Sequence, residues 1–131
     1  MKWTANDIDA AQRRMGTKAP VLCAKAVRRA FHKVGEMNKT EAAYAAYLDA
    51  QKKTGLIADY RFEAVKLRLA DKTFYTPDFV VLAPDGVLEM HEVKGFWEED
   101  ARVKIKVAAA QFPFRFLAIT RDKGNWAFES F

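Results

Sequence analysis

The sequence predicts a mixed α/β domain, in which a central β-sheet is flanked by helices. Two stretches carry apolar residues at helical spacing, and five others alternate apolar with polar residues or form short apolar runs. Their order along the chain is α-β-β-β-α-β-β, which is typical of a sheet covered by helices. The chain has 131 residues, 50% of them hydrophobic and 30% charged, which is the size and composition of one globular domain.

The first predicted helix covers residues 38–53. Asn38 is a good N-cap residue, Glu41 stands three residues later as in a capping box, and Gly55 ends the helix. Three strands are expected to follow, over residues 57–69, 74–83 and 87–94.

The second predicted helix opens at Trp97 or Glu98 and runs to about residue 111. Its apolar residues at helical spacing, which we expect to form its buried stripe, are Val103, Val107 and Ala110. Two last strands are expected over residues 114–120 and 126–131, and the first of these is apolar enough to be central in the sheet.

The net charge of +5 lies entirely in the first 37 residues. This segment has eight Lys and Arg against three Asp and Glu, whereas residues 38–131 have fourteen of each sign. We therefore divide the chain into a basic N-terminal arm (1–37) and a folded domain (38–131). A basic arm commonly meets a polyanion, nucleic acid first and an anionic membrane second; a solvated surface helix is the equally open alternative. The candidate DNA-binding residues of the arm are Arg13, Arg14, Lys25, Arg28, Arg29 and Lys33.

The sequence also argues against secretion and membrane insertion. Its longest apolar run, residues 42–48, has seven residues, far short of the ~20 that a membrane-spanning helix needs, and no secretory signal follows the N-terminal charges. The single cysteine, Cys23, has no partner for an internal disulfide. We therefore expect a cytoplasmic protein without a membrane partner.

Acidic residues and one lysine gather at the end of the hairpin predicted from residues 74–94. Strand parity sets Glu92 and Lys94 on one face. The connection Ala83-Pro84-Asp85-Gly86 suits a type I turn followed by a left-handed glycine, and this bulged loop would place Asp78 opposite Glu92. A two-residue loop would instead pair Asp78 with Val93 and turn its carboxylate away.

Carboxylates directly opposite each other lie roughly 5 Å apart and repel unless they hold a cation or share a proton. Oxygen ligands of this kind suit Mg²⁺ or Mn²⁺, and we expect one or two ions bound by Asp78, Glu92 and the Val93 carbonyl. Glu41 is the candidate ligand of a second ion or of a metal-bound water. Lys94 could orient that water or neutralise charge on a phosphate. Each residue alone has an ordinary structural explanation, Glu41 as a capping-box residue above all, and only their combination favours a metal site.

These residues resemble the PD-(D/E)xK nucleases. The resemblance covers roughly residues 38–120 and is closest to the phage endonuclease I group of Holliday-junction resolvases. The segments that carry it are Tyr75-Thr76-Pro77-Asp78-Phe79, Asp85-Gly86, Glu92-Val93-Lys94-Gly95-Phe96-Trp97 and Asp100-Ala101-Arg102-Val103-Lys104.

The resemblance implies a restriction-endonuclease-like fold and a Mg²⁺-dependent endodeoxyribonuclease. Asp78 and Glu92 would bind metal, Lys94 would assist catalysis, and Glu41 would complete the acidic set. It also implies a homodimer that cuts branched DNA in phage recombination, and hence in the host cytoplasm. The alternatives that stay open are a flap or nicking nuclease, an inactive DNA-binding module of the same fold, and an RNA or small-molecule phosphoesterase.

Further candidate DNA contacts follow the motif along the chain. Trp97 could stack on an exposed base or pack at a strand-to-helix corner. Three basic residues could grip phosphates or could form a solvated helix face with Arg102 paired to Glu98; they are Arg102, Lys104 and Lys106. His91 adjoins Glu92 but points to the opposite face by parity, so we expect a partly buried strand histidine and not a base.

Overall fold

The computed structural model describes residues 34–131, and the DNA contacts predicted at Arg13, Arg14, Lys25, Arg28, Arg29 and Lys33 lie outside them. The described part begins with helix α3 (Lys39–Lys53). It continues with β1 (Asp59–Phe62), β2 (Leu67–Ala70), β3 (Thr73–Tyr75), β4 (Phe79–Leu82), β5 (Leu88–Lys94), α4 (Glu99–Gln111), β6 (Arg115–Asp122) and β7 (Asn125–Ser130). Neither helix of this part is long and apolar enough to cross a membrane.

A five-stranded sheet with the order β1-β4-β5-β6-β7 forms the centre of this part of the chain. The middle strand, β5, pairs antiparallel with β4 and parallel with β6. A parallel pair needs a crossover connection, and α4 supplies it. The sheet is therefore mixed, which confirms the α/β class that the sequence predicts.

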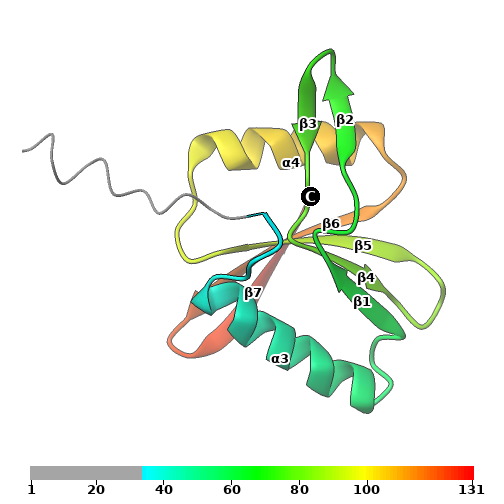
Figure 1. Cartoon of the computed structure of the whole chain (residues 1–131), viewed down its shortest axis with the longest axis vertical. Helices are drawn as coiled ribbons and strands as arrows, with labels where there is room; N and C mark the ends of the chain where they lie inside the picture. Colours follow the sequence, from blue (N-terminus) through cyan, green and yellow to red (C-terminus); the bar gives the residue numbers. More distant parts are fainter. Residues whose placement is uncertain (1–33) are drawn as a thin grey trace, which may run out of the picture. The chain divides into compact units, whose positions relative to one another are not determined.

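The two helices cover opposite faces of the sheet (Figure 1). One hydrophobic cluster joins α3 to the sheet, and its buried members are Tyr44, Ala45, Leu48, Phe79, Val81, Val93 and Ile119. The other joins α4 and the β2-β3 hairpin to the opposite face, and its buried members are Leu67, Leu69, Tyr75, Val80, Met90, Ile105, Ala108 and Phe116. Because side chains alternate along a strand, the even-numbered residues of β4 and β5 face α4.

Two of the predicted strands are each interrupted, which corrects the sequence interpretation. Residues 57–69 form β1 and β2 in separate sheets, with Glu63 between them at a φ of +44°. Residues 74–83 divide into β3 and β4 around Pro77, because proline lacks the N–H that a continuing ladder needs. β2 and β3 instead form a two-stranded sheet of their own that contacts α4.

The predicted buried stripe of α4 is also wrong. Val103 is 53% exposed, and Val107 and Ala110 are exposed as well. The helix buries Ile105 and Ala108 instead. Apolar residues occur on several sides of α4, so spacing by itself does not identify the side that the sheet covers.

Candidate active site

The loop between β4 and β5 has the predicted bulged form. The Ala83 N–H donates to the Val87 carbonyl at 2.9 Å, and Gly86 adopts a φ of +84°, in the left-handed region that favours glycine. The Asp85 carboxylate accepts a hydrogen bond from the Val87 N–H at 3.1 Å and stabilises the turn. The two-residue loop is thereby excluded.

This loop sets the register that the site needs. The ladder runs from the loop to Phe79, which pairs with His91. One step further along the same register, Asp78 lies opposite Glu92. Both carboxylates are buried, each with 6% of the residue surface exposed. Carboxylates are almost never this buried without a specific partner, so each one needs an explanation.

Asp78 is held by the backbone of the neighbouring strand. Its Oδ2 accepts a hydrogen bond from the Val93 N–H at 2.8 Å. The same register places Pro77 opposite Val93, and proline has no N–H to offer to the Val93 carbonyl. In an antiparallel strand, the N–H and the carbonyl of one residue point to the same side. The Val93 N–H points toward Asp78, so the Val93 carbonyl points to that side as well, where Pro77 cannot donate a hydrogen bond to it. The Val93 side chain lies on the other face, in the α3 cluster.

Glu92 has a partner at each oxygen. The Tyr75 hydroxyl donates to its Oε2 at 2.9 Å, and the Lys94 ammonium lies 2.9 Å from its Oε1. Burial, and next the charge of Glu92, raises the pKa of Tyr75, so the hydroxyl keeps its proton and donates. Tyr75 is the site residue that sequence reasoning missed. The alternation of apolar and polar residues around Tyr75 resembles that of many strands, so the sequence does not single it out. Only the folding of the β2-β3 hairpin brings its hydroxyl to Glu92.

Glu41 reaches the site from the first turn of α3. It forms the predicted capping box with Asn38: the Glu41 N–H donates to Asn38 Oδ1, and the Asn38 N–H donates to Glu41 Oε2, both at 2.9 Å. Only 2% of Glu41 is exposed, although capping-box glutamates usually lie in solvent. Its charge helps to raise the pKa of Asp78, so the two carboxylates interact.

Burial and neighbouring negative charges together set the electrostatics of the site. Burial raises the pKa of Asp78 to about 7, with further contributions from the carboxylates of Glu92 and Glu41. The Val93 N–H and the Lys94 ammonium act in the opposite direction but are outweighed. Burial alone would lower the pKa of Lys94, yet the three carboxylates raise it, so this amine stays protonated.

The oxygen atoms of the site suit a small hard cation that needs few protein ligands, and not an ion that needs many. No group of three or more His, Cys, Asp or Glu side chains between residues 34 and 131 is arranged to hold a metal ion. Mg²⁺, however, binds through one or two carboxylates and keeps several waters. Asp78 and Glu92 with the Val93 carbonyl meet that requirement, and a cation there would offset the charge that raises the pKa of Asp78.

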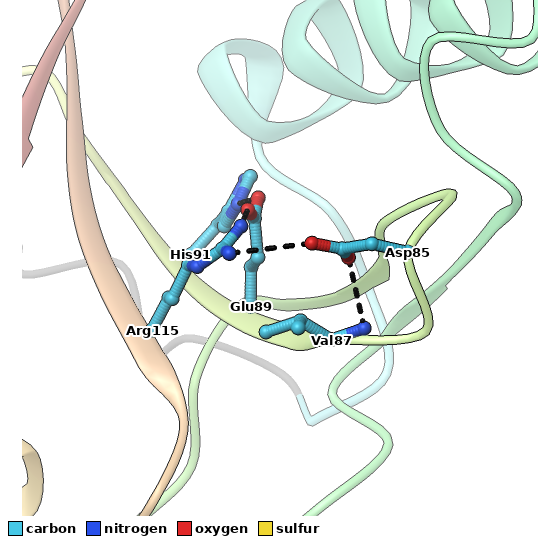
Figure 2. A network of polar contacts seen from close by, with 5 residues as sticks. All are labelled: Asp85, Val87, Glu89, His91 and Arg115. Carbon is cyan, nitrogen blue, oxygen red and sulfur yellow. Dashed lines mark hydrogen bonds and ion pairs between the residues drawn. The ribbon is translucent and has the colours of Figure 1, made fainter.

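His91 lies on the opposite face of β5, which confirms the parity argument. Its Nε2 donates to Glu89 at 3.1 Å, and its Nδ1 lies 2.8 Å from the Tyr44 hydroxyl of α3. Figure 2 shows how this pair continues outward: Arg115 contacts Glu89 at 3.1 Å and Asp85 of the turn at 3.3 Å. His91 therefore ties α3 and β6 to the hairpin on the face away from Glu92.

The basic residues that follow the motif have different surroundings. Arg102 binds Glu129 with both terminal guanidinium nitrogens, and its guanidinium carbon lies 5.6 Å from the Trp97 ring centroid. Trp97 packs against the hydrophobic cluster between α4 and the sheet, as expected for an aromatic residue that packs at a strand-to-helix corner. Lys104 and Lys106 are exposed. Arg102 thus pairs with Glu129 and not with Glu98, its partner in the alternative of a solvated helix face.

A pocket of about 300 Å³ opens beside Glu92 on the α4 face. Its lining combines the β3 strand and the residue after it with the first turns of α4, and consists of Phe74, Tyr75, Thr76, Glu92, Asp100, Ala101 and Lys104. One of the two opposed carboxylates is therefore accessible to a ligand from this side.

What the site can do follows from its own geometry and chemistry. No family model, no curated protein and no solved structure matches this chain.

Proposed function

We propose that this chain is a metal-dependent DNA endonuclease of the PD-(D/E)xK type, with a restriction-endonuclease-like fold. One observation carries the proposal: Asp78 and Glu92 are buried opposite each other at the end of one hairpin, with Lys94 on Glu92. Glu41, which is also buried, adds to the negative charge around Asp78. Buried carboxylates this close together disfavour folding unless they share a proton or bind a cation.

Asp78, Glu92 and the Val93 carbonyl would hold Mg²⁺ or Mn²⁺. When bound there, such an ion polarises a phosphoryl oxygen and makes its water more acidic. The Val93 N–H fixes one oxygen of Asp78, and Tyr75 and Lys94 fix Glu92. These contacts hold the two carboxylates in place before a ligand arrives, so little reorganisation is needed on binding.

Lys94 acts as the cation of the site toward phosphate. It keeps its proton because the neighbouring carboxylates raise its pKa. A protonated amine at this position can neutralise charge that develops on a phosphodiester during hydrolysis. Glu41 is a supporting carboxylate, fixed through its capping-box contact with Asn38.

The substrate and assembly belong to the same proposal. The resemblance supports branched DNA such as a Holliday junction, a homodimer that cuts two opposed strands, and action in the cytoplasm of a phage host. The basic arm would add affinity that depends on salt and not on DNA sequence. Dimer mass in solution and cleavage mapping on a four-way junction test these points directly.

The central experiment compares cleavage of labelled duplex and four-way junction DNA in Mg²⁺, Mn²⁺ and EDTA. Wild type should cleave in either ion and not in EDTA. Lys94→Ala should lose cleavage by 100-fold or more, on the order expected when one charge-stabilising group is removed. Lys53→Ala, at the exposed end of α3, is the matched control and should cleave normally. Binding of DNA by wild type without cleavage in any divalent ion would refute the enzyme and leave a DNA-binding module.

A further inference from the structure

We infer that the pocket beside Glu92 holds one unpaired nucleotide of the DNA, and that it prefers a base with an exocyclic amino group. The inference rests on the proposed function and deepens it, because it says which feature of the DNA the site recognises. Four observations support it: the place of the pocket, its size, its aromatic residue and the charges that line it.

The pocket adjoins the proposed metal site. Glu92 lines it, and so does Tyr75, whose hydroxyl is bonded to the same carboxylate. A ligand in the pocket is therefore a neighbour of any phosphate held at Asp78 and Glu92. In a DNA chain, that neighbour is the nucleotide attached to the scissile phosphodiester.

The size of the pocket fits one nucleotide and not a double helix. Its volume of about 300 Å³ is at the lower end of the range for small-ligand pockets. A base reaches such a pocket only when it leaves the stack, as happens at branches, bulges and flaps. A fully paired duplex would have to open a base pair first, at a cost in free energy.

Phe74 provides an aromatic surface at this pocket. The side chain lies on β3, 41% of the residue is exposed, and it lines the pocket. Lys66 holds its ammonium group 4.5 Å from the centroid of the ring. Exposed aromatic rings with nearby cations bind single-stranded nucleic acid, because every base has a face that can stack and a phosphate beside it.

The charges on the α4 side of the pocket point to a base. Asp100 and Lys104 lie one turn apart on the same helix face and both line the pocket. Lys104 suits a phosphate, whereas Asp100 would repel one. A carboxylate instead accepts hydrogen bonds from exocyclic amino groups, as with the N4 amino group of cytosine, and thymine has no such group.

The test measures binding by fluorescence anisotropy in Ca²⁺ buffer with the full chain. The probes are three labelled duplexes that differ at one place: an unpaired dC, an unpaired dT, or no unpaired nucleotide. Wild type should bind the unpaired dC duplex about tenfold more tightly than the paired one, and about fivefold more tightly than the dT duplex.

Two variants with matched controls assign the preferences to residues. Asp100→Asn should reduce the dC to dT ratio to about one, because an amide can donate to thymine as well as accept from cytosine; Glu99→Gln, also in the first turn of α4, should keep the ratio. Phe74→Ala should abolish the preference for unpaired DNA, and Phe128→Ala, an exposed aromatic residue of β7, should retain it.

Equal binding of all three duplexes by wild type, or an unchanged ratio in Asp100→Asn, would overturn the inference. Cleavage of the same duplexes in Mg²⁺ is followed separately. Cleavage without a preference for the unpaired nucleotide would refute the pocket assignment alone. A binding preference without cleavage in Mg²⁺ or Mn²⁺ would refute the endonuclease and leave a module that binds unpaired DNA.

Discussion

Asp78→Asn is expected to make the protein more stable at neutral and alkaline pH while abolishing cleavage. Asparagine has nearly the same shape, and its carbonyl oxygen can still accept the hydrogen bond from the Val93 N–H, which is 2.8 Å long in the wild type. The substitution therefore removes the buried negative charge and keeps the packing. Cleavage should be lost because the proposed metal ligand is gone.

The size of the effect follows from the pKa of Asp78, which burial and the neighbouring carboxylates raise from 3.8 to about 7. Between these two values the folded protein holds a proton that the unfolded chain releases, so wild-type stability falls as the pH rises. Above pH 7, this pKa difference lowers the free energy of unfolding of wild type by on the order of 4 kcal/mol. Below pH 4, it has almost no effect. The asparagine variant lacks this dependence.

Urea unfolding of wild type and Asp78→Asn from pH 4 to pH 9, without divalent ions, measures the effect. The variant should gain stability relative to wild type as the pH rises through this window, and Mg²⁺ should then stabilise wild type only. Asp71→Asn, at an exposed turn, is the control for a carboxylate outside the site. A stability difference that does not change with pH, or a variant less stable than wild type at pH 8, would refute the account of the site as a cluster of excess negative charge.

Three further experiments test contacts in the site and on the opposite face of β5. Tyr75→Phe removes the hydrogen bond to the Glu92 carboxylate, so the free energy of unfolding should fall by about 1.5–3 kcal/mol in urea titrations. Gly86→Ala places a Cβ at a φ of +84° and should cost about 1–2 kcal/mol, and an unchanged unfolding midpoint would contradict the bulged loop. Tyr44→Phe and His91→Ala should show a coupling energy of about 1 kcal/mol in a double-mutant cycle, and strict additivity would contradict the 2.8 Å contact between their side chains.

The parts of the site that the sequence predicted are those fixed by local rules. The residues Pro84-Asp85-Gly86 specify one loop type, the loop fixes the register, and the register brings Asp78 and Glu92 together. The capping box of Asn38 and Glu41 is local in the same way. Strand parity was enough to separate His91 from Glu92, because side chains alternate strictly along β5.

The parts that could not be predicted depend on contacts between distant segments. Tyr75 reaches Glu92 only because β2 and β3 leave the main sheet and fold over its α4 face. Ile105 is buried and Val103 exposed because the sheet approaches α4 from one side, which helical spacing alone does not identify. The partner of Arg102 is Glu129, from a strand 27 residues away, and not the nearby Glu98.

The two faces of β5 differ in their electrostatics, and this difference supports the proposed function. On the α3 face, Arg115 lies between Asp85 and Glu89, and His91 completes the network, so each charge has an opposite or a neutral partner. On the face that Glu92 occupies, every buried polar side-chain atom among the described residues also has a hydrogen-bond partner, yet burial and the charges of Glu92 and Glu41 raise the pKa of Asp78 despite the nearby Lys94. Hydrogen bonds satisfy the geometry there without balancing the charge. A cation would supply the balance, and a phosphate brought to that cation would meet Lys94.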